Sequence, residues 1–218
     1  MKLSKSVQIL VLLLVLAIVL PLFLTCRSLV SADESFFLSV NRLWNSDFAD
    51  LFTVLSELGS FYFWFIVVFI LWIWGKRTLA TYLLVGILIH IAVGGPMKYF
   101  VDRPRPFEVF PDAFHLFTPS DPSFPSGHSE GSFVAAIALG LRDKRFLVPL
   151  SLFAAYVGAS RVIIGVHFPY DVFGGAIIGI VAGALAASLD LSKLQARMES
   201  GWAKLTSFLL RHHPPNGE

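Results

Sequence analysis

The stretch VFGGAIIGIVAGALAASL, residues 172–189, is long and apolar enough to cross a membrane as a single helix. A spanning helix needs about 20 mostly apolar residues, and this stretch contains no charged side chain. Its glycines at positions 175, 179 and 183 recur every four residues, which lets a neighbouring helix approach closely. We interpret these glycines as a packing feature of a membrane-spanning helix.

Similar apolar segments occur along the whole chain. Of its 218 residues, 56% are hydrophobic and only 15% are charged, which is too apolar for an ordinary water-soluble domain. We therefore expect an all-α, polytopic membrane protein, with a six-transmembrane-helix bundle in residues 1–192 and a tail in residues 193–218. The expected transmembrane segments are, approximately, 7–25, 61–75, 79–95, 128–141, 146–161 and 171–189.

The first apolar segment and the amphipathic stretch that follows it each leave an alternative open. The apolar run from Val7 to Leu24 is longer than the core of a typical signal peptide, although residues 30–32 resemble a cleavage site. After it, apolar side chains recur at near-helical spacing among charged ones, which predicts an amphipathic helix at the membrane surface. That helix could cap the bundle or form a gate for lipid entry. Its apolar side chains are Phe37, Val40, Trp44, Leu51 and Leu55, and its charged ones include Asp33 and Glu57.

The charges exclude some functions and predict an orientation. A formal net charge of +2, spread along the chain, gives no support to nucleic-acid binding, and the single Cys26 excludes an internal disulfide and a cysteine-rich metal site. The basic loops at residues 2–5, 76–77 and 142–145 fall on one side if six helices alternate. By the positive-inside rule this side is cytoplasmic, together with both termini.

The outward loops nevertheless contain cations that the positive-inside rule does not explain. Lys98, Arg103 and Arg105 directly follow an apolar segment, and Lys and Arg together can hold a tetrahedral anion from several directions. Taken alone, this cluster could also be a patch that binds lipid headgroups.

Two histidine motifs lie on the same predicted side. Pro125-Ser126-Gly127-His128 opens an apolar segment, where a helix N-terminus offers free N–H groups to an anion and His128 could protonate a leaving group. Arg161, His167 and Asp171 lie between the last two segments. If Asp171 accepts a hydrogen bond from one ring nitrogen of His167, the other nitrogen becomes a nucleophile. The plainer alternatives are a structural histidine at position 128 and a helix-capping Asp171.

These residues together resemble the type 2 phosphatidic acid phosphatase (PAP2) superfamily of membrane lipid phosphatases. Its three motifs match Lys98 with Arg105-Pro106, then Pro125-Ser126-Gly127-His128, then Ser160-Arg161 with His167 and Asp171. Because the family spacing from the lysine selects Arg105, Arg103 becomes an auxiliary contact. The three motifs extend over residues 98–171, and such a spaced set is far more specific than any one motif alone.

The resemblance implies a role for each matched residue. His167 attacks phosphorus to give a phosphohistidine, Asp171 orients it, and His128 protonates the leaving group. The residues implied to bind the phosphate are Lys98, Arg105, Ser126, Gly127 and Arg161. It also implies that no metal or other cofactor is needed, and we interpret Asp102, Asp112 and Asp121 as solvated loop residues.

The expected activity is hydrolysis of a lipid phosphate or diphosphate at the extracytoplasmic face of the cell membrane. A polyprenyl (undecaprenyl or dolichyl) diphosphate is the first choice of substrate, followed by phosphatidylglycerol phosphate or phosphatidate. Three alternatives remain: a lipid phosphotransferase, an anion or lipid-phosphate transporter, and a non-catalytic lipid-binding protein. A transporter would place its site near the membrane midplane, whereas these residues flank the helices at one end. The oligomeric state is left open.

Overall fold

The computed structural model describes residues 25–42 and 56–212 without a break, together with positions 4, 5, 7–10, 12, 13, 16, 21, 52 and 54. In this part of the chain the regular secondary structure is entirely helical, as expected. Most of the expected first transmembrane segment, 7–25, and residues 43–51 of the amphipathic run lie outside the described residues.

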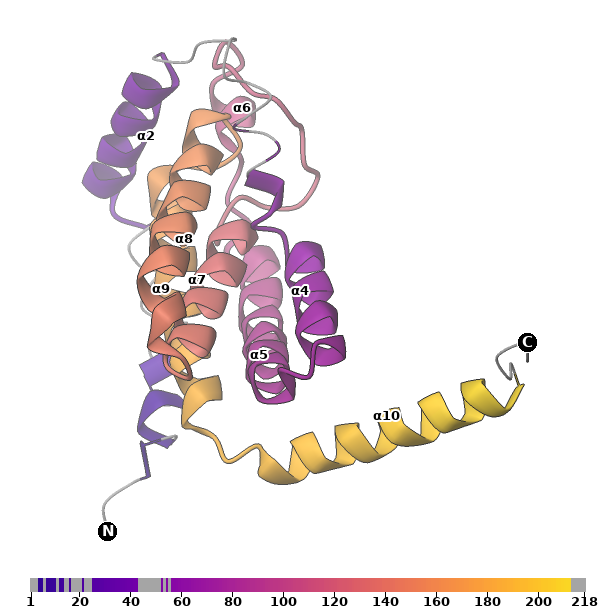
Figure 1. Cartoon of the computed structure of the whole chain (residues 1–218). Helices are drawn as coiled ribbons and strands as arrows, with labels where there is room; N and C mark the ends of the chain where they lie inside the picture. Colours follow the sequence, from indigo (N-terminus) through magenta and orange to yellow (C-terminus); the bar gives the residue numbers. More distant parts are fainter. Residues whose placement is uncertain are drawn as a thin grey trace.

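Five helices lie side by side and form the bundle (Figure 1). They are α4 (Phe61–Ile73), α5 (Arg77–Val101), α7 (Gly127–Gly140), α8 (Leu147–Ile163) and α9 (Pro169–Ser188), with a short 3-10 turn, η2 (Lys144–Phe146), before α8. Among the described residues, three helical segments are long and apolar enough to cross a membrane: 77–109, 144–163 and 169–188. The six-span count therefore stays a prediction.

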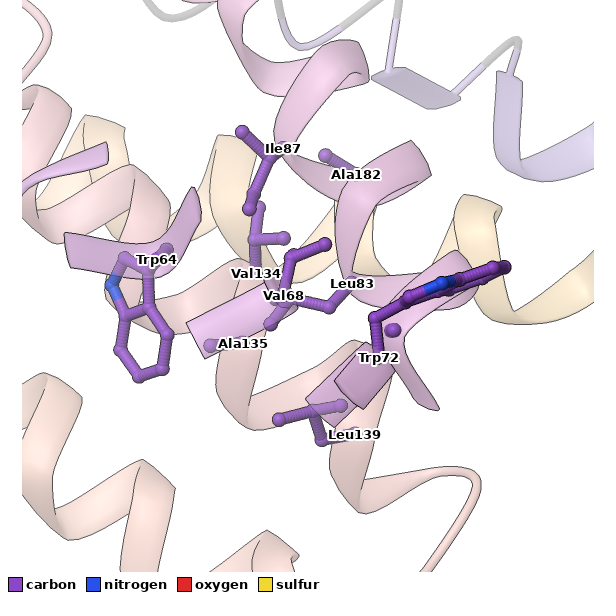
Figure 2. Close-up of a cluster of buried hydrophobic side chains, with 10 residues drawn as sticks. Trp64, Val68, Trp72, Leu83, Ile87, Val134, Ala135, Leu139 and Ala182 are labelled. Atoms are coloured by element: carbon purple, nitrogen blue, oxygen red, sulfur yellow. The ribbon is translucent and has the colours of Figure 1, made fainter. Parts of the chain in front are cut away.

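The helix α7 lies in the middle of the bundle because small residues let its neighbours approach. In Figure 2, Val134, Ala135 and Leu139 of α7 pack among apolar side chains of α4, α5 and α9. A Cβ added at Gly175 would lie 2.5 Å from the Ser126 carbonyl oxygen. One added at Gly183 would lie 2.9 Å from the carbonyl oxygen of Val134. The structure thus confirms that the α9 glycines serve close helix packing.

Two helix boundaries position the candidate site. α5 extends well beyond the expected end at residue 95 and stops at Asp102, whose φ of 49° is left-handed, so Lys98 lies in its last turn. α9 begins at Pro169, which leaves His167 in the preceding loop, as proline chemistry predicts. The short helix α6 (Pro106–Val109) follows Arg105.

The helix α2 (Arg27–Asn41) packs beside the same end of the bundle (Figure 1). Its inner face carries Asp33, Phe37 and Asn41, all buried. The aromatic ring of Phe37 lies edge-on to that of Phe168, with 5.4 Å between centroids. Asp33 was expected on the solvated face of an amphipathic helix, and that expectation is wrong. Its carboxylate is buried because Arg103 pairs with it.

The chain ends in a further helix, α10 (Ser192–His212), which runs away from the bundle in Figure 1. Most of the expected tail, residues 193–218, belongs to this helix of 21 residues. Met198 and Trp202 pack against the main apolar cluster. Thr78 of α5 donates a hydrogen bond to Gln195, 3.2 Å long. α10 therefore docks at the N-terminal end of α5, whereas Lys98 lies near the other end.

Candidate active site

Four helix ends and the loop before α9 meet around one cavity of about 350 Å³: the C-terminal ends of α5 and α8 and the N-terminal ends of α4 and α7. A volume of this size is enough for a small ligand or headgroup. The cavity contains residues from all three sequence motifs. Those lining it from the predicted set are Lys98, Arg105, Gly127, His128, Arg161 and His167. Asp171 lies behind His167, and Ser126 caps α7.

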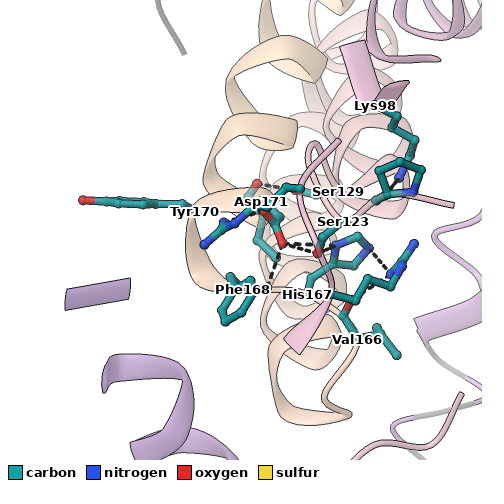
Figure 3. Close-up of polar contacts among 12 residues, drawn as sticks. Lys98, Ser123, Ser129, Val166, His167, Phe168, Tyr170 and Asp171 are labelled. Atoms are coloured by element: carbon teal, nitrogen blue, oxygen red, sulfur yellow. Dashed lines mark hydrogen bonds and ion pairs between the residues drawn. The ribbon is translucent and has the colours of Figure 1, made fainter. Parts of the chain in front are cut away.

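The ring of His167 has different partners at its two nitrogens. Nδ1 lies 3.5 Å from Asp171 Oδ2 and 3.4 Å from Ser123 Oγ (Figure 3). Nε2 lies 3.5 Å from Nη1 of Arg105. Burial lowers the pKa of His167 to about 3, helped by the positive charge of Arg105 and opposed by Asp171. His167 is therefore neutral at neutral pH, which is the state that a nucleophile requires.

The carboxylate of Asp171 is fully buried and accepts several hydrogen bonds. Oδ2 accepts from Ser123 Oγ at 2.6 Å and from the Phe168 N–H at 2.8 Å. The second of these bonds caps α9, so the capping role considered from the sequence is present as well. Asp171 thus caps its own helix and faces Nδ1 of His167 at the same time.

Arg103 links Asp171 to the helix α2. Its Nη1 donates to Asp171 Oδ1 and its Nη2 to Asp33 Oδ2, both at 2.6 Å. The guanidinium carbon also lies 4.2 Å from the centre of the Phe168 ring, an additional cation–π contact. Arg103 is not among the cavity-lining residues. It therefore contacts the Asp171 carboxylate on the side away from His167 and does not reach the cavity as a further anion contact.

Asp121 bridges two of the predicted phosphate-binding cations. Its carboxylate pairs with Lys98 Nζ at 2.9 Å and with Arg105 Nη2 at 2.7 Å. Burial alone would raise the pKa of Asp121, but Lys98 and Arg105 lower it to about 2. Its side chain is 40% exposed, so it is a partly solvated loop residue, but it also bridges both cations, which the sequence interpretation did not include.

Glu57 pairs in the same way with the other side of the cavity. Its Oε1 lies 3.1 Å from Arg161 Nη1 and 3.5 Å from His128 Nε2. The hydrogen bond to His128 and the charge of Arg161 lower the pKa of Glu57 to about 2. Arg161 also donates to Ser56 Oγ at 2.6 Å. Each of the three cations of the cavity thus has a carboxylate partner, Asp121 for Lys98 and Arg105 and Glu57 for Arg161, which leaves one positive charge in excess.

The start of α7 supplies the remaining predicted contacts. The Ser126 N–H donates to the Asp171 carbonyl oxygen at 3.0 Å, and the buried Ser126 hydroxyl has no partner. Gly127 lines the cavity, and a Cβ added there would meet nothing within 4 Å. A ligand can therefore approach the Gly127 backbone directly.

Sequence reasoning missed four partners of the site: Asp33, Glu57, Asp121 and Ser123. Asp33 and Arg103 are 70 positions apart in the chain, and Ser123 and Asp171 are 48 apart. No local spacing signals such pairs. The only available signal was Arg103 itself, a second arginine beside the one that the motif selects.

Comparison with known proteins gives the same family over the region of the site. The family model of the PAP2 superfamily matches residues 79–193. The chain is 32% identical over 143 residues to an undecaprenyl-diphosphatase of Sulfolobus acidocaldarius, covering 64% of this chain and 69% of that protein. It is 30% identical over 126 residues to the undecaprenyl-diphosphatase BcrC of Bacillus subtilis, covering 55% of this chain and 64% of BcrC.

Two solved structures share the fold. LpxE of Aquifex aeolicus superposes with a TM-score of 0.66 at 32% identity, covering 71% of this chain and 94% of LpxE. A transmembrane PAP2-type phosphatidylglycerolphosphate phosphatase of Bacillus subtilis gives a TM-score of 0.65 at 26% identity, covering 84% of this chain and 94% of the other. Because the family model matches more than half of the sequence and includes every cavity-lining motif residue, this chain belongs to the PAP2 superfamily.

Proposed function

We propose that this protein hydrolyses a membrane lipid phosphate or diphosphate through a phosphohistidine at His167, without a metal ion. One observation carries the proposal. A neutral His167, backed by Asp171, shares a cavity with His128 and with three cations. An anion-binding site alone has no need of the His167–Asp171 pair.

In the first step, His167 Nε2 attacks phosphorus. The N–P bond forms while the bond from phosphorus to the leaving oxygen breaks, and His128 donates a proton to that oxygen. The imidazole becomes positively charged, and Asp171 stabilises it through Nδ1–H. Water then attacks the phosphohistidine, its oxygen bonds to phosphorus, the N–P bond breaks, and the water proton passes to His128.

The cations stabilise the charge that spreads over the phosphoryl oxygens. Lys98, Arg105 and Arg161 surround the cavity, and the Gly127 N–H with the Ser126 hydroxyl adds neutral donors. On binding, the phosphate takes the place of Asp121 and Glu57 as partner of these cations. Since Asp121 and Glu57 already pair with these cations, an incoming phosphate replaces carboxylate partners that are already present.

A polyprenyl diphosphate is the substrate that we propose first. Both of the relatives compared above carry the name undecaprenyl-diphosphatase. The second candidate, phosphatidylglycerol phosphate, is favoured by the similarity to the structure from Bacillus subtilis, which is named a phosphatidylglycerolphosphate phosphatase. We further propose that the site faces the extracytoplasmic side and that both termini are cytoplasmic, as the basic loops predict.

The test is a phosphate-release assay on purified protein with EDTA, over polyprenyl diphosphates, phospholipid phosphates and soluble phosphate esters. We expect turnover with EDTA present and none in His167→Ala. His115→Ala is the matched control, because His115 lies in the loop but does not line the cavity. Full activity in His167→Ala would refute the assignment of His167 as the nucleophile. Turnover that EDTA abolishes would refute the metal-independent mechanism.

A further inference from the structure

A second pair of titratable side chains lies in the same cavity, away from the motif residues. His90 of α5 and Glu130 of α7 both line it, and their side chains are only 4% and 3% exposed. His90 Nδ1 lies 3.2 Å from Glu130 Oε2. Neither residue belongs to the three motifs, and the proposed chemistry uses neither of them.

The pair lies deeper in the bundle than the phosphate-binding cations. His90, Gly94 and Lys98 follow one another at four-residue spacing on α5, so His90 lies about 12 Å along the helix axis from Lys98. His90 lies within an apolar segment long enough to span the membrane. Ionisable groups at such positions are costly, and they are commonly functional.

The backbone provides space for this pair. A Cβ added at Gly94 would overlap the carboxylate of Glu130 and lie 2.6 Å from its Cδ. Glu130 therefore fits against α5 only because position 94 has no side chain. The missing side chain gives the carboxylate a defined place in the cavity wall.

The pair leaves two buried polar atoms without partners, His90 Nε2 and Glu130 Oε1. Buried polar atoms are normally satisfied by protein or by ordered water, and leaving one unpaired costs about 1–3 kcal/mol. Because both residues line the cavity, a molecule inside it can supply the missing partner.

The hydrogen bonds that these two atoms can form determine which kind of molecule can be their partner. Glu130 Oε1 of an ionised carboxylate accepts a hydrogen bond, and His90 Nε2 accepts or donates according to its protonation. A fully ionised phosphate group has only acceptors to offer a carboxylate, and its negative charge is repelled by it. A hydroxyl donates to the carboxylate and can also accept from the imidazole, so one hydroxyl group can satisfy both atoms.

We propose that His90 and Glu130 form a hydroxyl-binding subsite, whose occupant is the water that hydrolyses the phosphohistidine or a hydroxyl of the lipid headgroup. The water role rests on the proposed function. In that role the pair binds the water and orients it, while the proton still passes to His128.

The first test separates formation of the phosphoenzyme from its hydrolysis by rapid-quench kinetics. We compare the wild type with Glu130→Gln, which keeps the size of the side chain and removes its charge. If the occupant is water, the variant forms phosphoenzyme at the wild-type rate, but its steady-state turnover falls at least about tenfold for every substrate. If the occupant is a lipid hydroxyl, phosphoenzyme formation slows in the variant only for substrates whose headgroup carries a hydroxyl.

Methanol serves as a probe hydroxyl in the same experiment. Because methanol competes with water for the phosphoryl group, the ratio of methyl phosphate to inorganic phosphate changes in Glu130→Gln if this pair binds the attacking hydroxyl. The matched control is Ser132→Ala, which removes another buried and unpartnered oxygen of α7 that does not line the cavity. It should leave the ratio and the turnover unchanged.

Two outcomes overturn the subsite. One is wild-type kinetics and an unchanged methanol ratio in Glu130→Gln, and the other is an equal slowing of both steps for all substrates, which indicates a structural role only.

A high-resolution crystal structure of the resting protein tests the subsite without turnover. An oxygen within about 3.2 Å of both His90 Nε2 and Glu130 Oε1 supports the subsite, and the absence of any such oxygen refutes it. If that oxygen is present but no phosphoenzyme forms in the wild type, the proposed function fails and the subsite stands.

Discussion

At the residue scale, the environment of Asp171 explains how a buried carboxylate can stay ionised next to a neutral imidazole. Arg103 pairs with one oxygen, while Ser123 and the Phe168 N–H donate to the other. In the reaction that we propose, these donors fix the carboxylate before His167 gains charge, so little reorganisation is needed. The second carboxylate on Arg103, Asp33, holds the guanidinium in place from α2.

We expect Asp33→Asn to lower kcat by about tenfold to a hundredfold with KM nearly unchanged, because Arg103 then loses one of its two fixed partners. The measurement is steady-state kinetics together with the melting temperature in detergent. Glu34→Gln, the same change one position further along α2, should leave kcat unchanged. A variant that melts earlier but keeps its kcat would show that Asp33 acts on stability alone.

A second residue-scale prediction concerns pH. The pKa of Asp121 is lowered from 3.8 to about 2, so its ion pairs stabilise the folded state above pH 3.8 and are lost as pH falls through about 2. We expect the wild-type melting temperature to fall over this range and Asp121→Asn to lack that part of the fall. Asp112→Asn, in the same loop, should follow the wild type. Parallel curves for all three proteins would contradict the assignment.

The sequence predicted the motif residues of the cavity but not their partners. His128, Arg161 and His167 belong to spaced motifs, and helix alternation placed them on one side. Asp33 and Asp121 gave no such signal, because an acidic residue in a polar stretch looks the same whether it is solvated or paired across the fold. Their pairing depends on tertiary contacts that local spacing does not encode.

At the element scale, α7 and α9 pack through glycines that have no room for a side chain. A Cβ at Gly179 would collide with the carbonyl oxygen of Glu130. We expect Gly179→Ala to lower the free energy of unfolding by about 1–3 kcal/mol. Gly201→Ala, on α10 with nothing within 4 Å, should be neutral or raise it by roughly 0.5–1 kcal/mol. Denaturation in mild detergent measures both, and equal effects of the two variants would contradict the packing role.

Removal of α10 provides a second test at this scale. The helix contacts the N-terminal end of α5, far along that helix from Lys98. A chain ending at Leu191 should therefore keep its kcat within about twofold. Its melting temperature should fall, because Met198 and Trp202 no longer cover the apolar cluster. A large loss of kcat would show that α10 acts on the cavity.

Apolar patterning predicted which segments are helical, but it placed some ends poorly. α5 continues through Lys98 to Val101, beyond the expected end at residue 95, and Lys98 and Tyr99 of its last turn line the cavity. α10 is helical although its sequence is mostly polar, and two of its apolar side chains, Met198 and Trp202, dock on the bundle. In both cases tertiary contacts outweigh local hydropathy.

At the scale of the whole molecule, orientation in the membrane is open to direct test. In a Cys26→Ser background, we expect a membrane-impermeant maleimide to label Asp112→Cys in intact cells. Lys144→Cys should be labelled only after permeabilisation, because its basic loop is predicted to be cytoplasmic. The reverse pattern would place the cavity on the cytoplasmic side.

The pairing of Glu57 and Asp121 with the cavity cations also affects how a substrate arrives. Opposite charges a few ångströms apart weaken each other's field at long range, so the three cations with their two carboxylates project a much weaker field beyond about 10 Å than three unpaired cations would. Encounter then depends on lateral diffusion within the bilayer instead of electrostatic steering. Consequently, the second-order rate of capture should depend little on ionic strength, unlike that of enzymes whose active sites present unpaired charges to the surrounding water.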